Sequence, residues 1–458
     1  DEMMMTEQYR KRVKAILESL STLRYSQVRP AGSVSVAEGT YELKPEFRKE
    51  EYVWQPFEPG DTWGGRDKHY WFYGPVEIPV DYENQPVVLM LNTGAVDIWN
   101  TDNPQVLVYL NGKLASTMDM NHTRMTLVEC GKAGTVLETA FYAYSNSAGK
   151  TNFFDVTIGI LNRDVEGLYY DMKVLWEAAD LLKEDDLERL HLFELLNNCA
   201  SCLDLRRTDN TEFFRSVAAA RQFLAENYYD VEHGISPVTV HGVGHTHIDV
   251  AWKWPLRQTR QKAVRSFLTV LNLMKEYPEY RFMSSQPQLY EFVKEEAPEL
   301  YEQIKERVRE GRWETEGAMW LEADCNLISG ESMIRQILYG KQFFKQEFGT
   351  GDDEVMWLPD VFGYSVAMPQ ILRKSGVKYF MTTKIGWNEY NQIPNDTMIW
   401  RGLDGSEVLT HFITTSAYCK NPELNPNRSF GTTYNGLMNA SQVMGTWQRY
   451  QNKDINGD

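Results

Sequence analysis

The spacing of apolar residues changes along this chain, and that change restricts the fold more than any other feature. From about 35 to 163 the apolar residues form short runs of aromatic and β-branched residues, such as 70–73 and 106–110, separated by Gly, Asn, Asp and Pro. Runs of this kind predict strands joined by turns, and Asn111-Gly112 is a typical hairpin turn. We therefore expect an all-β sandwich over residues 35–163.

Helical spacing lies on both sides of this stretch. Near the start of the chain, Val13, Ile16, Leu17 and Leu20 recur at helical intervals. This predicts a docked N-terminal helix and a linker over 1–34. Leucines then recur at helical spacing on an acidic background over 164–236, which predicts a helical linker.

After Pro237 the apolar runs alternate between strand and helix spacing. Predicted strands at 238–243, 281–284, 355–358 and 378–382 are interrupted by predicted helices at 258–276, 288–310 and 367–375. Such alternation indicates parallel strands with helical crossovers. The fold class we expect is therefore multidomain: a β-sandwich, a helical bridge and an α/β catalytic domain over 237–458.

Charge excludes one large class of partners. Lys and Arg total 47 against 64 Asp and Glu, so the formal net charge is −17. An acidic surface repels nucleic acid and anionic membranes, and we expect neither as a partner. The 13% aromatic content favours a neutral ligand such as a sugar.

Two features of the sequence predict a cytoplasmic location. We find no basic and apolar export signal at the start and no run of about 18 apolar residues. An odd number of cysteines, five, is typical of a reducing compartment. We expect a cytoplasmic protein, and a homo-oligomer is also compatible with the sequence.

Three of the eight histidines lie within seven residues, His241, His245 and His247, and Asp249 follows. They come at the carboxyl end of a predicted strand, where α/β folds place their sites. Because side chains two residues apart in extended backbone point the same way, either His245, His247 and Asp249 converge or the last two converge alone. Imidazole and carboxylate ligands suit zinc or a similar divalent ion. A hydrogen-bonded His/Asp cluster without metal is the alternative.

Other polar residues follow further predicted strands. Asp360 comes directly after the apolar run 355–358, so it is either a site residue or a helix N-cap. Residues 316–324 bring three carboxylates and Trp320 together, either as part of a site or as a solvated helix start.

Several blocks then match one enzyme family, in the family's order. They are Gly244-His-Thr-His-Ile-Asp-Val-Ala-Trp252 and residues 312–324, 329–336, 357–365 and 400–412. Together they resemble the N-terminal half of glycoside hydrolase family 38 α-mannosidases of the intracellular and bacterial type. The resemblance covers about 238–415, and the region before it fits the same subgroup more loosely.

The resemblance implies retaining exo-hydrolysis of terminal α-linked mannose on a mannose-containing oligosaccharide. It implies a zinc ion, with another divalent ion such as Co²⁺ as an alternative, held by His247, Asp249 and Asp360. Asp360 also matches the nucleophile that forms a glycosyl-enzyme, and Trp252 matches the aromatic floor of the mannose site. Further candidate substrate contacts in the matched blocks are Trp320, Glu322, Asp324 and Tyr364. The family's fold is a seven-stranded β/α barrel.

The resemblance also implies groups outside this chain. The family's fourth zinc ligand and its general acid come after the matched region, so we expect both in a remainder of the chain beyond Asp458. Losing an acid catalyst costs about 10²–10⁴-fold in rate, so residues 1–458 alone should hydrolyse α-mannosides poorly or not at all.

Two other functions fit some of these features. A metal-dependent deacetylase or amidohydrolase acting on a carbohydrate also uses His and Asp ligands at strand ends, with a metal-bound water as nucleophile. A non-catalytic carbohydrate-binding protein would use the 35–163 sandwich as its binding module.

Overall fold

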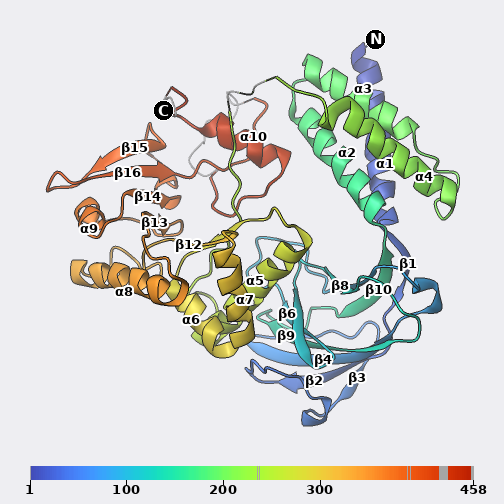
Figure 1. The fold of residues 1–458 in the computed structure, drawn as a ribbon, viewed down its shortest axis with the longest axis horizontal. Helices are drawn as coiled ribbons and strands as arrows, with labels where there is room; N and C mark the ends of the chain where they lie inside the picture. Colours follow the sequence, from blue (N-terminus) through green and yellow to red (C-terminus); the bar gives the residue numbers. More distant parts are fainter. Residues whose placement is uncertain are drawn as a thin grey trace.

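Figure 1 shows the computed structural model, which describes residues 2–454 except 235, 237, 389, 392 and 422–431. Three parts are visible: a helical bundle, a β-sandwich and a mixed α/β part. The structure thus combines several sheets with helices, as the sequence predicts.

Two antiparallel sheets form the sandwich. One sheet consists, in spatial order, of β1 (Tyr25–Pro30), β10 (Asp155–Leu161), β5 (Val87–Asn92) and β8 (Arg124–Val128). The other consists of β3 (Gln55–Phe57), β2 (Val34–Gly39), β4 (Lys68–Glu77), β9 (Val136–Ser145), β6 (Gln105–Leu110) and β7 (Lys113–Met118). Their inner faces share one core that includes Phe72, Leu89, Val106, Phe141 and Ile158.

Two details of the sandwich follow from local sequence. The β6–β7 hairpin turns at Asn111 and Gly112, whose φ angles are +51° and +84°, as the Asn-Gly turn predicts. The first strand begins at Tyr25, before the expected start at 35, and pairs with β10. Because β1 is a partly exposed edge strand, it lacks the dense apolar run that marks the inner strands.

The helical bundle contains the helix that precedes the sandwich and the helices that follow it. Helix α1 (Glu2–Leu23) packs against α2 (Arg163–Leu181) and α3 (Leu187–Ser201), and α4 (Thr211–Leu224) completes the core. Val13, Ile16, Leu17 and Leu20 are buried there, which confirms the helical spacing. The N-terminal helix is therefore part of the same bundle as the segment expected to be a linker, because their apolar faces cover one another.

The α/β part contains a curved array of parallel strands. β11 (Phe282–Ser284) pairs with β12 (Trp313–Thr315), and β13 (Val355–Leu358) pairs with β14 (Tyr379–Thr382) and then β16 (Glu407–Phe412). A single parallel bridge from Gly244 to Phe282 extends the array beyond β11. A second, from Gly317 to Met356, joins the two sheets. Among the described strands of this array, β15 (Thr397–Arg401), at the edge, is the antiparallel one.

Helices lie between most of these strands. They are α5 (Leu256–Glu276), α6 (Pro287–Glu296), α7 (Pro298–Arg309), α8 (Gly330–Phe348) and α9 (Met368–Lys374), and α10 (Ala440–Arg449) follows the array. No strand pairing closes the array within the described residues, so the seven-stranded barrel stays a prediction. Among those residues, none of the helices is long and apolar enough to cross a bilayer.

Two expected elements differ from the structure. Residues 238–243 form no strand, and only Gly244 bridges to β11. The helix expected over 288–310 is two helices, α6 and α7, since Pro298 cannot donate the backbone hydrogen bond that continues α6.

Helix α5 fixes the sandwich against the α/β part. Thr269 Oγ1 lies 2.6 Å from Thr117 Oγ1, Asn272 Nδ2 donates to the carbonyl of Ala115, and Arg265 forms a 2.6 Å ion pair with Asp119. Because α5 follows directly after Asp249 and Trp252, this contact also fixes the segment that carries them.

Candidate active site

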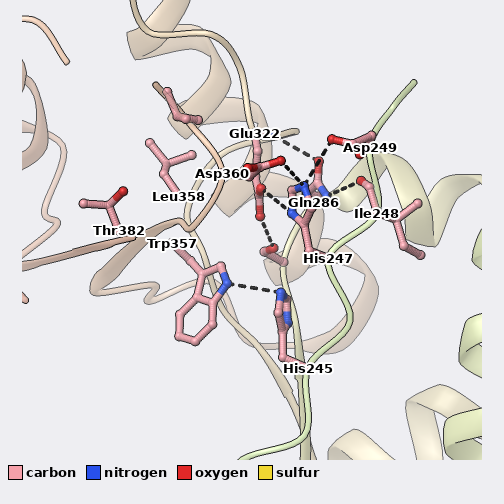
Figure 2. A network of polar contacts seen from close by, with 12 residues as sticks. His245, His247, Ile248, Asp249, Gln286, Glu322, Trp357, Leu358, Asp360 and Thr382 are labelled. Carbon is pink, nitrogen blue, oxygen red and sulfur yellow. Dashed lines mark hydrogen bonds and ion pairs between the residues drawn. The ribbon is translucent and has the colours of Figure 1, made fainter. Parts of the chain in front are cut away.

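His247 lies at the centre of a group of carboxylates at the carboxyl edge of the parallel array (Figure 2). Its Nε2 is 3.2 Å from Asp249 Oδ1 and 3.4 Å from Asp360 Oδ2, and its Nδ1 is 2.9 Å from Glu322 Oε2. The side chain is only 7% exposed. One imidazole therefore contacts three carboxylates in a nearly dry environment.

Strand ends bring these residues together. His247 comes three residues after the Gly244 bridge, and Asp360 comes two residues after β13. Parallel strands end at the same edge of a sheet, so side chains far apart in sequence meet there. This is the position that the sequence predicts for a site.

The charge on His247 is set by its neighbours. Burial opposes protonation of the ring, but the charge of Glu322 and the hydrogen bonds to Asp249 and Asp360 outweigh it and raise the pKa of His247 to about 12. In the absence of another cation, the ring is an imidazolium that balances the surrounding carboxylates.

Glu322 is itself held in place from two directions. Ser285 Oγ donates to Glu322 Oε1 at 3.1 Å, and Gln286 Oε1 accepts from the backbone N–H of Glu322 at 3.1 Å. Gln286 Nε2 also donates to the carbonyl of Ile248, next to His247 (Figure 2). Gln286 has a φ of +65°, an unfavourable conformation for a non-glycine residue. The amide therefore couples the His247 segment to the Glu322 segment.

Asp360 has a cation of its own. Lys384 Nζ lies 2.9 Å from Asp360 Oδ1, and the Lys384 side chain is 7% exposed. The ammonium also lies 3.5 Å from the centroid of the Trp387 ring. Burial favours the neutral acid, but hydrogen bonds to His247 and Lys384 outweigh it and lower the pKa of Asp360. Asp360 is therefore ionised at neutral pH.

The other two histidines of the cluster do not join the group. His245 Nδ1 lies 2.9 Å from the carbonyl oxygen of Met283, and Trp357 Nε1 donates to His245 Nε2 at 3.2 Å. Both ring nitrogens are thus engaged, while His241 is exposed. Of the two arrangements compatible with the sequence, the structure has the one in which His247 and Asp249 converge without His245.

The donor set fits a divalent metal ion. His247, Asp249 and Asp360 each offer one ligand atom within 4.8 Å of the others. One nitrogen and two carboxylate oxygens are ligands that zinc accepts, and Glu322 at the far ring nitrogen is the kind of partner that orients a metal-binding histidine.

Comparison with known proteins places this geometry in a family. Residues 237–458, which contain the whole group, match the family model described as "Glycosyl hydrolases family 38 N-terminal domain". Residues 237–458 belong to glycoside hydrolase family 38.

Named relatives agree with this family 38 assignment. The chain is 32% identical to alpha-mannosidase G of Dictyostelium discoideum over 375 residues, which is 78% of this chain and 33% of that protein. It is 32% identical to alpha-mannosidase 2C1 of Mus musculus over 399 residues, or 84% of this chain and 38% of that protein. The chain thus spans about a third of the length of these relatives. An alpha-mannosidase structure from Enterococcus faecalis V583 is similar at 23% identity and a TM-score of 0.32, covering 37% of this chain and 19% of that one.

The remaining predicted substrate contacts of this family 38 segment divide into two groups. Trp252 is 57% exposed and lines a cleft beside His247 and Asp249, which suits a sugar platform. Glu322 contacts His247 and not open space, because it is buried behind the ring. It is better described as a residue that orients His247.

Three predicted substrate contacts have structural roles away from the open cleft. Trp320 packs edge-on against Phe343 and donates to Gln288, because it points outward between α6 and α8. Asp324 is exposed and accepts from the backbone N–H of Asn326 in a turn. Tyr364 is within hydrogen-bond distance of the carbonyls of Leu358 and Val361, so it fixes the backbone on both sides of Asp360.

The family 38 site also contains residues that sequence reasoning did not assign. Lys384 and Gln286 lie at predicted strand ends, a signal that identified their positions but not their partners. Tyr434 lies edge-on to His247 with ring centroids 5.3 Å apart, and burial together with the Asp360 charge raises its pKa. No motif in the sequence marks Tyr434.

Proposed function

We propose that the protein containing this chain is a retaining exo-α-mannosidase that removes terminal α-linked mannose from oligosaccharides. The observation that supports it most directly is Asp360, which is ionised, partly exposed and held between His247 and Lys384. A fixed, ionised carboxylate at the edge of an open cleft is what nucleophilic glycoside hydrolysis requires. The family match and the names of its relatives support this substrate class.

Asp360 carries the first chemical step. One carboxylate oxygen forms a bond to the anomeric carbon while the bond to the leaving oxygen breaks, and a general acid gives that oxygen a proton. Water then attacks the same carbon and gives a proton to the deprotonated general acid, which releases mannose and restores both the carboxylate and the acid. Lys384 keeps Asp360 ionised between turnovers and stabilises the charge that returns to it.

The positions around Asp360 prepare this step. Glu322 holds His247 in one orientation, and Gln286 holds Glu322 and Ile248 together, so Asp249 and Asp360 face a common point. His247, Asp249 and Asp360 would hold a zinc ion there. Such an ion supplies positive charge to nearby sugar hydroxyls and favours distortion of the ring toward the transition state.

The general acid and a further metal ligand are expected outside residues 1–458. We therefore expect the isolated 1–458 polypeptide with added zinc to hydrolyse an aryl α-mannoside poorly or not at all. Rapid turnover by this polypeptide would contradict that expectation.

The nucleophile can be identified by covalent trapping in the protein expressed from its complete gene. A fluorinated α-mannosyl fluoride that reacts rapidly and is released slowly should add one fluorohexosyl group to the peptide containing Asp360. An adduct on another residue would contradict the assignment. Hydrolysis of acetylated sugars without any adduct would favour the deacetylase instead.

The metal can be tested separately by elemental analysis. We expect purified wild-type protein to contain zinc or a similar divalent ion, and His247→Ala to lose it, because His247 supplies the only nitrogen of the described group. If His247→Ala retained stoichiometric metal, the site would lie elsewhere.

A further inference from the structure

His245 stays outside the carboxylate group, yet it connects segments that supply that group. Its Nδ1 lies 2.9 Å from the carbonyl oxygen of Met283, and Trp357 Nε1 donates to its Nε2 at 3.2 Å (Figure 2). The His245 and Trp357 rings meet edge-on, with centroids 5.0 Å apart. One partly buried imidazole therefore joins three segments that are distant in sequence.

These two hydrogen bonds allow one proton arrangement on the ring. An indole N–H can only donate, so His245 Nε2 must accept from Trp357. The proton of the neutral ring then lies on Nδ1, which donates it to the carbonyl of Met283. Because both nitrogens are used in different roles, the ring cannot turn over without breaking both bonds.

The bond to Trp357 crosses the strand array. Gly244, next to His245, bridges to β11, and β11 pairs with β12. β13, which contains Trp357, bridges to Gly317, two residues beyond β12. In a flat sheet, three strand spacings of about 4.8 Å would separate the two bonded strands by about 14 Å. The side chains meet directly because the array is curved and both lie on its concave face.

This concave face is the one that carries the metal ligands. Met356 and Leu358, on either side of Trp357, are buried in one apolar cluster with residues of α8 and α9, so Trp357 points to the opposite face. His247 follows His245 by two residues, and its side chain points to the same side. The hydrogen bond to Trp357 therefore lies beside the carboxylate group, inside the curve of the array.

Strand pairing alone joins the two halves of the array weakly. Between β12 and β13 the described residues form a single bridge at Gly317, where Trp357 N lies 3.4 Å from the carbonyl oxygen, long for a hydrogen bond. His247 and Asp249 lie on one side of this junction, and Asp360 lies on the other. Zinc bonds to such ligands are about 2.0–2.2 Å long, so the two sides must keep their relative positions to within a few tenths of an ångström.

The bond to Met283 supports a second group. Met283 directly precedes the segment 284–286, which holds Glu322. The carbonyl of Met283 accepts from His245, so the end of β11 stays beside the segment of the metal-binding histidine. The same imidazole thus supports both the carboxylate that orients that histidine and the strand that supplies the nucleophile.

We propose that His245 is a positioning residue for the metal ion. As the Nδ1–H tautomer, held between Met283 and Trp357, it fixes the distance from the nucleophilic aspartate to the two metal ligands that follow it in sequence. The inference rests on the metal site of the proposed function. His245 acts through the strand ends, because its own nitrogens are both engaged and do not bind the ion.

The test measures zinc affinity in the protein expressed from its complete gene, by competition for zinc with a chelating dye. Trp357→Phe keeps a ring but removes the Nε1–H donor, and zinc should bind about tenfold more weakly, as for loss of other groups that orient metal ligands. Trp357→Phe added to His245→Leu should weaken binding no further than His245→Leu alone, because both substitutions break the same bond. A double variant with the full product of the two single effects would overturn the proposal.

A matched control lies in β12. Trp313 Nε1 donates to the Tyr290 hydroxyl at 2.9 Å, in the apolar core that contains α5 and α6 residues. Trp313→Phe removes the same kind of donor, so it should lower the urea midpoint of the metal-free protein but leave zinc affinity unchanged. Equal losses of zinc affinity in Trp313→Phe and Trp357→Phe would show a general effect of stability and overturn the positioning role.

The remaining outcomes separate this inference from the proposed function. If His245→Leu does not fold, the comparison of Trp357→Phe with Trp313→Phe decides. Wild-type zinc affinity in folded Trp357→Phe would overturn the positioning role and leave the metal site intact. If zinc binding by the wild type does not depend on His247, the metal site fails and the inference fails with it.

Discussion

Strand β13 has an aspartate two residues beyond each end, and the two have opposite electrostatic environments. Asp360, after the strand, lies between His247 and Lys384, and its pKa is lowered. Asp353, before the strand, is 2% exposed and has an unpartnered carboxylate oxygen. Burial and the nearby Glu316 raise the pKa of Asp353 to about 8.

The difference shows that burial alone does not decide the charge of an aspartate. Both side chains lose hydration, which favours the neutral acid. At Asp360 two adjacent cations reverse that preference, whereas at Asp353 the neighbouring Glu316 reinforces it. One end of the strand is therefore suited to nucleophilic chemistry, and the other holds a neutral acid in the core.

The largest expected effect comes from replacing each of the two aspartates in turn by asparagine. Asp360→Asn should lower kcat on an α-mannoside by about 10⁴-fold or more, because the nucleophile is lost. Asp353→Asn should leave kcat within about twofold. Steady-state kinetics on both variants of the complete protein, with circular dichroism to check folding, would make the measurement. Near wild-type rates for Asp360→Asn would disprove its role.

The second test concerns stability at the other end. Asp353 has an ordinary pKa of 3.8 and a folded pKa of about 8, so between these pH values the folded state keeps a proton that the unfolded state has released. Stability therefore falls as pH rises from about 4 to about 8. Asp353→Asn should remove this loss and stabilise the protein at pH 7 by up to about 4 kcal/mol relative to wild type.

Urea denaturation at pH 4.5 and at pH 7 would measure that difference. Exposed Asp352 supplies the control, since Asp352→Asn should keep the wild-type dependence on pH. Equal pH dependence in wild type and Asp353→Asn would show that Asp353 is ionised in the folded state.

A smaller effect is expected from replacing Lys384, the cation beside Asp360. Lys384→Met removes one of the two groups that lower the pKa of Asp360, so that pKa should rise. As the pH falls, Asp360 should then become protonated at a higher pH than in the wild type. The acid limb of the kcat/KM profile should therefore move to higher pH. At neutral pH we expect a loss of about 10–100-fold, measured from pH-rate profiles against Lys384→Arg, which keeps the charge. An unmoved acid limb would exclude Lys384 as the cause.

The smallest effect should come from the backbone around Asp360. Tyr364→Phe removes the hydroxyl that contacts the carbonyls of Leu358 and Val361, and we expect a loss of about 1 kcal/mol in the free energy of unfolding. Thermal denaturation would measure it. No loss of stability would indicate that this hydroxyl does not fix the strand end.

The sequence predicts most of the elements but fewer of the contacts. Apolar spacing located the helical regions of the bundle, and it located β13 and β14 closely, because periodicity reports which face is buried. It missed β1 and placed a strand at 238–243, since an exposed edge strand and an exposed loop differ little in local pattern.

The site shows the same limit. Strand-end position and residue type brought His247, Asp249 and Asp360 into one hypothesis, and the structure places them together. Trp320 and Tyr364 lie in equally distinctive blocks, yet their side chains point into packing contacts that only the three-dimensional fold defines. The role of Tyr434 depends on a contact across the array with His247, for which local sequence carries no signal.

The pairing of α1 with α2 and α3 has a consequence for biosynthesis. Helix α1 is translated before α2 and α3, so Val13 and Leu20 are covered only after the helices that begin at Arg163 have emerged from the ribosome. All strands of the sandwich lie between α1 and α2 in the sequence, so the sandwich can fold before α1 is covered. In the folded sandwich the N–H of Asn162 donates to the carbonyl of Arg24 at 2.7 Å. This contact brings the end of α1 close to the start of α2. We therefore expect that folding of the sandwich shortens the flexible loop between α1 and α2, and so lowers the entropic cost of their pairing during synthesis.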